Sequence, residues 1–142
     1  MKTIGKIDFI DLPEFGIKNI EAKIDTGANR SSLHCLDIKT KIIEGKEWLT
    51  FKVPFVIKGT DEFKTDHFFK KNVKSSSGHV EDRFIIKTEV VLFGETIETT
   101  FSLTNREDMK FPILLGCKLL KGRFTVDVAQ KNLSFKFKNI NE

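Results

Sequence analysis

Hydrophobic and polar residues alternate along most of this chain with a period of two, which is typical of half-buried β-strands. The clearest alternating runs cover residues 20–24, 49–57, 97–103 and 133–137. Residues 7–12, 32–36, 63–69 and 83–93 are predicted as further strands. Many short strands with almost no helical periodicity predict an all-β chain that folds as a barrel or a sandwich.

Glycine and proline mark the predicted connections between these strands. Turns are expected at residues 13–16, 58–61 and 75–78, and Gly94-Glu95 is expected to form a two-residue type II′ hairpin turn. Pro54 cannot donate a hydrogen bond to a ladder, so we expect the strand at 49–57 to lie at a sheet edge. One short helix is predicted over 114–122, ending at Gly122.

Composition narrows the class of protein. A chain of 142 residues is long enough for one domain with its own core. Its 14 Phe residues should mostly be packing material, because Phe has no polar group. The net charge of +4 is small, and its one local basic cluster is Lys70, Lys71 and Lys74. An exposed edge strand explains these lysines better than nucleic-acid binding does.

Neither a membrane span nor a disulfide scaffold is expected. No run of 18 apolar residues occurs, and residues 1–6 lack the apolar stretch of a signal peptide. We therefore expect a cytoplasmic protein. Cys35 and Cys117 should be reduced thiols in that compartment, packed as small hydrophobic groups.

The tripeptide Asp25-Thr26-Gly27 is the strongest chemical signal. It follows the strand at 20–24, so Asp25 enters a glycine-containing turn at a strand end, where a carboxylate can form the floor of a cleft. The alternative is an ordinary Asx turn. The chain has no second Asp-Thr-Gly or Asp-Ser-Gly. Chemistry with two carboxylates would therefore require a second copy of the chain.

A second element lies far downstream, where the apolar run 112–115 leads into Gly116 and then into the predicted helix. This order is the layout of retropepsin-like aspartic proteases. The chain resembles, over nearly its whole length, the bacterial retropepsin-like family labelled ATP-dependent zinc proteases. Members of that family are commonly found beside ATP-grasp glutamate ligases. The matching stretches are residues 22–28, 31–34, 73–78, 81–83, 103–106, 109–116 and 120–127.

The resemblance implies a single retropepsin-like domain over residues 1–142, folded as a closed barrel with one short C-terminal helix. Compared with viral retropepsins, extra sequence at about 40–67 is expected to form an additional hairpin, made of the strands at 48–57 and 63–69. Two positions depart from the family pattern. Cys117 stands where a basic residue is expected, and Arg30 stands where a small hydroxyl residue is more usual.

The resemblance also implies the activity, which is that of an aspartic endopeptidase acting as a homodimer. Two Asp25 carboxylates that share one proton would activate a water molecule to attack a peptide bond. Thr26 would form a hydrogen bond across the two-fold axis, and Gly27 would permit close approach of the backbone. Ala28 would leave room for a peptide or protein substrate. The segments near Ile4 and Phe135 are the expected interface strands.

A flap over the cleft is implied as well, with its tip at Ser75, Ser76, Ser77 and Gly78. The alternative is an ordinary surface turn. Arg83, at the base of this flap, could pair with a carboxylate or orient an acidic peptide. Its alternative is a surface ion pair of small energetic value.

Metal and nucleotide chemistry have little support in the sequence. His-Glu-x-x-His, paired Cys-x-x-Cys and glycine-rich phosphate loops do not occur, and His34, His67 and His79 lie far apart. We therefore expect no metal and no other cofactor. Two rival functions stay open. One is a non-catalytic module that binds a peptide or protein within an ATP-grasp glutamate ligase system, and the other is a metal-dependent hydrolase.

Overall fold

The computed structural model describes residues 1–54, 62–74, 78, 80–105, 108 and 110–141. Its strands are β1 (Lys2–Ile4), β2 (Ile7–Leu12), β3 (Ile17–Ile24), β4 (Ser31–His34), β5 (Leu36–Ile43), β6 (Lys46–Lys52), β7 (Glu62–Thr65), β8 (Phe68–Lys74), β9 (Val80–Leu92), β10 (Glu95–Thr104), β11 (Ile113–Leu115) and β12 (Phe124–Val126). Its helices are the 3₁₀ turn η1 (Pro13–Phe15), α1 (Cys117–Leu120) and α2 (Leu133–Asn141).

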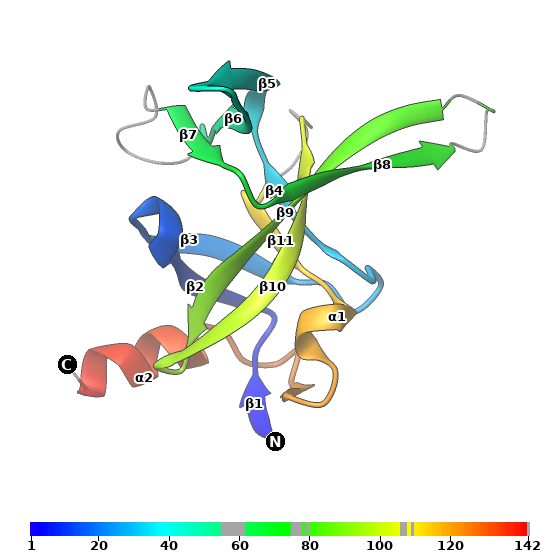
Figure 1. Ribbon diagram of the computed structural model, residues 1–142. Coiled ribbons are helices and arrows are strands. Elements are labelled where there is room, and N and C mark those ends of the chain that lie inside the picture. Colours follow the sequence, from blue (N-terminus) through cyan, green and yellow to red (C-terminus); the bar gives the residue numbers. More distant parts are fainter. Residues whose placement is uncertain (55–61, 75–77, 79, 106–107, 109, 142) are drawn as a thin grey trace.

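Six strands close into a barrel in the order β10, β4, β11, β3, β2 and β9, and the pairing of β9 with β10 completes the ring (Figure 1). Every barrel strand contributes to one buried hydrophobic cluster, for example through Ile10, Ala22, Leu33, Val90, Phe101 and Ile113. The prediction of an all-β closed barrel is therefore confirmed. The short helix is confirmed as α1, and it begins just after β11 and Gly116.

The turn between β9 and β10 differs from the prediction by one residue. Leu92 pairs with Glu95, so the two-residue loop is Phe93-Gly94. Both residues have positive φ angles, 51° and 72°, which is typical of a type I′ turn and not of type II′. The ring of Phe93 packs 5.8 Å from that of Phe124 and 6.0 Å from that of Phe137. These tertiary contacts explain why a bulky residue occupies a left-handed position.

A separate sheet contains β5, β6 and β7, with β6 in the middle. The prediction of an edge strand was therefore wrong, because β6 ends at Lys52 and its ladders do not include Pro54. The predicted return strand at 63–69 is two strands, β7 and β8, which belong to different sheets and are separated by Asp66 and His67. The turn expected at 58–61 lies outside the described residues.

Strands β8 and β9 form a long antiparallel hairpin that extends away from the barrel (Figure 1). Strand β8 is at the edge of the barrel sheet, and Lys70 and Lys71 are exposed on it, as the sequence predicted. In Figure 1 this hairpin and the β5–β7 sheet lie toward one end of the barrel, while α1, α2 and β1 lie toward the other.

The C-terminal segment is a helix, so the strand predicted at 133–137 was wrong. The fully buried Asp8 explains the difference, because its carboxylate accepts hydrogen bonds from the backbone N–H groups of Ser134 and Phe135 in the first turn of α2. The rings of Phe9 and Phe135 pack 5.1 Å apart. A partner on β2 thus satisfies helix N–H groups that would otherwise lack acceptors.

Both terminal segments pack against other elements of the same chain. Strand β1 pairs in parallel with β12, which places the buried Ile4 beside Val126. Phe135 lies in a helix, so the interface strand expected there was wrong. In the described part of the chain, no helix combines the length and apolar character needed to cross a bilayer.

Candidate active site

The carboxylate of Asp25 is held by the loop that follows β3. Strand β3 runs parallel to β11 and pairs Ile24 with Leu115. One residue later, the Asp25 backbone N–H donates to the Leu115 carbonyl over 2.9 Å. The Asp25 Oδ1 atom accepts a hydrogen bond of 3.0 Å from the Gly27 N–H. The side chain is half-buried, so it is fixed by the backbone and still accessible.

Gly116 and the start of α1 secure the other half of this loop. The N–H groups of Cys117 and Lys118 donate to the carbonyls of Ala28 and Asn29, over 2.7 and 2.8 Å. The Gly116 N–H donates to the buried Ser31 hydroxyl over 3.0 Å. A Cβ atom on Gly116 would lie 2.8 Å from the Ala28 carbonyl oxygen. The apolar segment that ends in glycine is thus the packing partner of the Asp25 loop.

Asp25 lines a cleft of about 550 Å³ between the barrel and the β8–β9 hairpin. Three of the predicted site residues meet there, namely Asp25, Ala28 and Arg83. The lining is completed by Arg30, Ser32, Lys71, Asn72, Ser102, Thr104 and Leu114.

The other predicted site residues do not line this cleft or fall outside the description. Thr26 and Gly27 are exposed on the loop beside it. Gly78 is exposed, with a φ angle of 86°. Ser75, Ser76 and Ser77, the predicted flap tip, lie outside the described residues.

The cleft carries an excess of positive charge. Asp25 is its single carboxylate among the described lining residues, whereas Arg30, Lys71 and Arg83 are basic. The Arg30 Nε atom is buried and has no hydrogen-bond partner in the described part of the chain. Arg83 likewise forms no ion pair with a described residue. A buried N–H donor without an acceptor is costly, and the excess of positive charge favours an anionic ligand group as that acceptor.

Sequence reasoning missed Arg30 and Lys71 as cleft residues. Arg30 was noticed only as a departure from the family pattern, and Lys71 only as a charge on an edge strand. Their convergence depends on how β4 and the β8–β9 hairpin approach each other across the barrel. The one signal in the sequence was that Arg30 stands between the matched family segments 22–28 and 31–34, and that Lys71 stands two residues before the segment 73–78.

The two cysteines are free thiols with different surroundings. Cys35 is completely buried, and burial raises the pKa of its thiol, so it stays neutral. Cys117 is half-buried beneath the Asp25 loop, and its Sγ atom donates to the Thr26 carbonyl over 3.0 Å. Neither residue lines the cleft, so neither is placed as a nucleophile.

The described residues do not fit a zinc site. The Nδ1 atom of the buried His34 lies 3.2 Å from the Thr104 carbonyl oxygen, and His67 pairs with Asp66 on a different segment. Within the described ranges, no group of three or more His, Cys, Asp or Glu side chains could hold a metal ion. A zinc ion bound by protein needs about three or four such ligands.

Known proteins match this chain both in sequence and in fold. Residues 3–136 match the family model described as RimB-like, the retropepsin-like aspartic endopeptidase RimB. The chain is also similar to the crystal structure of Lpg0085, a protein of unknown function from Legionella pneumophila. That match has a TM-score of 0.76 at 25% identity and covers 94% of this chain and 98% of the other.

Curated relatives carry a different name. The chain is 35% identical over 131 residues to a probable alpha-L-glutamate ligase of Desulfotalea psychrophila, covering 90% of this chain and 28% of that protein. It is 29% identical over 130 residues to a probable alpha-L-glutamate ligase of Shewanella halifaxensis, again covering 28% of the relative. The chain therefore spans little more than a quarter of the length of these relatives.

Proposed function

Because the chain belongs to the RimB-like family of retropepsin-like aspartic endopeptidases, we propose that it hydrolyses peptide bonds as a homodimer in which each subunit contributes Asp25. The observation that carries the proposal is the position of Asp25. Its half-buried carboxylate accepts a backbone hydrogen bond from Gly27 and lies in a cleft whose described lining contains no second carboxylate. A second copy of the chain supplies the missing acid.

The mechanism follows from two carboxylates that share one proton. The ionised carboxylate takes a proton from water while the oxygen attacks the scissile carbonyl carbon, and the protonated carboxyl donates a hydrogen bond to the carbonyl oxygen. The tetrahedral intermediate then collapses, the C–N bond breaks, and the leaving amine receives a proton. The pair titrates as a unit because two like charges at this distance do not both ionise easily.

Thr26, Gly27 and Ala28 support this site in the proposal. The Thr26 side chain is exposed and has no hydrogen-bond partner within the described part of its own chain, so it is available to bond across the dimer axis. The Gly27 N–H orients the Asp25 carboxylate. Ala28 provides a small side chain in the cleft. The β8–β9 hairpin acts as the flap in this proposal, because its described residues Lys71, Asn72 and Arg83 line the cleft.

The proposed substrate is a peptide rich in acidic residues. Arg30, Lys71 and Arg83 line the same cleft as Asp25, and the buried Nε atom of Arg30 lacks a partner among the described residues. Substrate carboxylates would pair with these cations, and a guanidinium can bind a carboxylate with two parallel hydrogen bonds. Arg83 therefore orients an acidic peptide in this proposal.

The curated relatives favour one alternative. Their name, probable alpha-L-glutamate ligase, and the small share of their length that matches suggest a module that works together with an ATP-grasp ligase. In the alternative, the same domain binds a glutamate-modified peptide without cleaving it. Both versions treat residues 1–142 as one domain with an addition at about 40–67. Both also place it in the bacterial cytoplasm, where Cys35 and Cys117 stay reduced.

A peptide-cleavage assay separates these functions. Wild type and Asp25→Asn are incubated with internally quenched peptides containing runs of Glu or of Gln, from acid to neutral pH, with and without EDTA. We expect cleavage of the Glu peptides, a loss of at least about 100-fold in Asp25→Asn, and inhibition by a pepstatin-like hydroxyl inhibitor. Asparagine can still accept the Gly27 hydrogen bond, so the fold should survive.

Three results would decide against the peptidase. Residual activity near that of wild type in Asp25→Asn would reject the carboxylate mechanism. Activity lost with EDTA and regained with zinc would establish a metal-dependent hydrolase. Tight binding of Glu peptides by wild type without any cleavage would favour the binding module.

A further inference from the structure

A second cavity adjoins the active-site cleft, and the proposed function leaves it unused. It has a volume of about 340 Å³ and lies between the β5–β7 sheet and the ends of β9 and β10. Arg83 and Thr104 line both this cavity and the cleft that contains Asp25. An extended peptide in the cleft that continues past these two residues would enter the second cavity.

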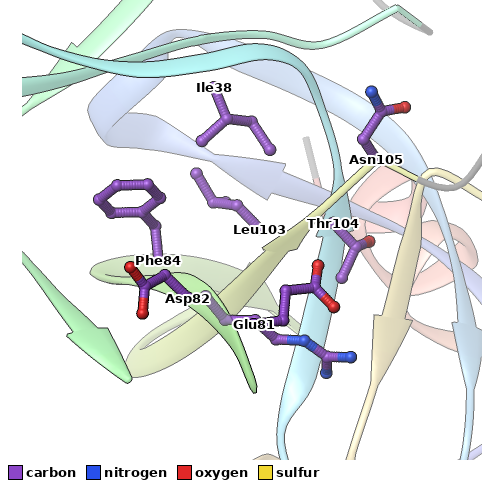
Figure 2. A pocket seen from close by; sticks show the side chains of 8 residues that line it. Ile38, Glu81, Asp82, Phe84, Leu103, Thr104 and Asn105 are labelled. Carbon is purple, nitrogen blue, oxygen red and sulfur yellow. The ribbon is translucent and has the colours of Figure 1, made fainter. Parts of the chain in front are cut away.

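The floor of the second cavity is apolar. Ile38 from β5, Phe84 from β9 and Leu103 from β10 lie around it (Figure 2). Leu103 is only 4% exposed, and Ile38 and Phe84 pack against the same hydrophobic core. This floor is therefore held in place by the hydrophobic core, and a chain of methylene groups could displace water from it.

The rim of the second cavity is acidic. Glu81 and Asp82 are both exposed, and Figure 2 shows the Asp82 carboxylate beside Phe84 and the Glu81 carboxylate on the side of Thr104. Neither forms an ion pair with any described residue. The Nζ atom of Lys70 lies 5.4 Å from the centroid of the Phe84 ring, so this aromatic side chain already accommodates an ammonium group. Counting Arg83, which lines both sites, the described lining of the cavity has two carboxylates and one cation, whereas that of the cleft has one carboxylate and three cations.

We propose that this cavity is a substrate subsite for a lysine or arginine side chain that lies some residues away from the scissile bond. The proposal rests on the proposed peptidase function. The methylene stem would cover Ile38, Phe84 and Leu103, and the cationic group would reach the Asp82 carboxylate beside Phe84, while Glu81 adds negative charge to the rim. A glutamate side chain would be repelled by the rim, and norleucine would fill the floor but leave the carboxylates without a partner.

Combining the two sites gives a two-part specificity. The cleft around Asp25 selects acidic residues, and the second cavity selects a basic residue further along the same peptide. The β5–β7 sheet acquires a role, because Ile38 supplies part of the subsite floor. The peptidase would then prefer acidic segments at a defined distance from a lysine or arginine over uniformly acidic peptides.

The test uses quenched peptides with glutamate at the central positions. Each outer position is occupied in turn by Lys, Arg, norleucine, Gln or Glu, and kcat/KM is measured. At one outer position, Lys and Arg should exceed norleucine by about two- to fivefold, the range of an exposed ion pair, and Glu should be the poorest. The double variant Glu81→Gln/Asp82→Asn should lose this preference. The control Glu89→Gln/Glu98→Gln, exposed on β9 and β10 outside both cavities, should keep it.

A charge reversal and a binding measurement complete the test. Asp82→Lys should favour Glu over Lys at the same outer position. In methyl NMR, N-acetyl-lysine amide should shift Ile38 and Leu103 signals in wild type and not in the double variant. Cleavage of the library with no difference between Lys and norleucine at any outer position would overturn the subsite and leave the peptidase intact. If wild type cleaves no peptide, the proposed peptidase function is rejected. In that case the NMR measurement still tests the subsite, and absence of the shifts rejects it independently.

Discussion

At the scale of single residues, Asp8 illustrates how one buried side chain determines the structure around it. Its carboxylate accepts hydrogen bonds from Phe9, Ser134 and Phe135 and has no exposed surface. Asp8→Ala would leave three backbone N–H groups without this acceptor, two of them at the start of α2. We expect a loss of about 1–3 kcal/mol in the free energy of unfolding, measured by urea denaturation at pH 7. Glu98→Ala, an exposed control on β10, should change it by less than about 0.5 kcal/mol.

The same residue predicts a pH dependence. Burial raises the pKa of Asp8 above its usual value of 3.8, although the three N–H donors oppose this rise. The folded chain therefore keeps the proton to a higher pH than the unfolded chain. The resulting stabilisation is fully present below pH 3.8 and is lost as the pH rises through the folded pKa.

Asp8→Asn cannot titrate at this position, so it serves as the reference for that pH dependence. The difference in unfolding free energy between wild type and Asp8→Asn should be largest near pH 3 and decrease toward neutral pH. Urea titrations of both proteins across this range provide the measurement. A difference that grows with pH would mean that the N–H donors outweigh burial and that the pKa of Asp8 is lowered.

At the scale of secondary-structure elements, the contact between the Asp25 loop and Gly116 leaves no room for a side chain at position 116. A Cβ atom at position 116 would approach the Ala28 oxygen to 2.8 Å and backbone atoms of Arg30 to 2.9 Å, and these backbone atoms have little room to move. Gly116→Ala should therefore cost about 2–3 kcal/mol and displace Asp25 enough to reduce peptidase activity strongly.

Gly122→Ala is a matched control for Gly116→Ala. Gly122 has a φ angle of 77°, and a Cβ atom added there would have no described atom within 4 Å. The control should cost about 1 kcal/mol from backbone strain alone and leave activity unchanged. Thermal unfolding and the quenched-peptide assay measure both variants. Equal stability and activity in the two variants would mean that the loop does not depend on this contact.

The sequence predicted those elements well in which the pattern of hydrophobic and polar residues directly reflects which face of the element is buried. Strands β3, β9 and β10 alternate between core and solvent, and α1 follows a glycine directly. The failures have tertiary causes. The segment of α2 alternates like a strand, but Asp8 satisfies its first N–H groups from far away in the chain. Pro54 suggested an edge strand, but β6 ends before it.

The candidate site, like the fold, could be predicted from the sequence only in part. Asp25 and Gly116 could be linked because each belongs to a recognisable segment, and the structure places the two segments in contact. Arg30 and Lys71 could not be linked, because they come from the loop after β3 and from an edge strand, with no periodicity in common. Their shared cleft arises only when the barrel closes and brings the β8–β9 hairpin over it.

At the scale of the whole molecule, the chain supplies half of the proposed catalytic pair. Asp25 has no second carboxylate beside it in the described cleft lining, and Thr26 is exposed on the same loop. Strand β1 is paired with β12 of its own chain, and the C-terminal segment is a helix on β2. The dimer contact should therefore centre on the Asp25 loop and the flap, which predicts a modest interface and a concentration-dependent activity.

Mixing wild type with Asp25→Asn tests this stoichiometry without knowledge of the interface. If each active site needs Asp25 from both subunits, a variant chain inactivates every wild-type chain that it pairs with. If subunits exchange at random between dimers, a fourfold excess of variant chains should leave about one fifth of the wild-type activity. Adding the same excess of a Gly116→Ala/Asp25→Asn chain, whose loop is displaced, should inhibit less. Wild-type activity that is unaffected by the variant, at concentrations where size-exclusion chromatography shows exchange, would mean that one chain suffices.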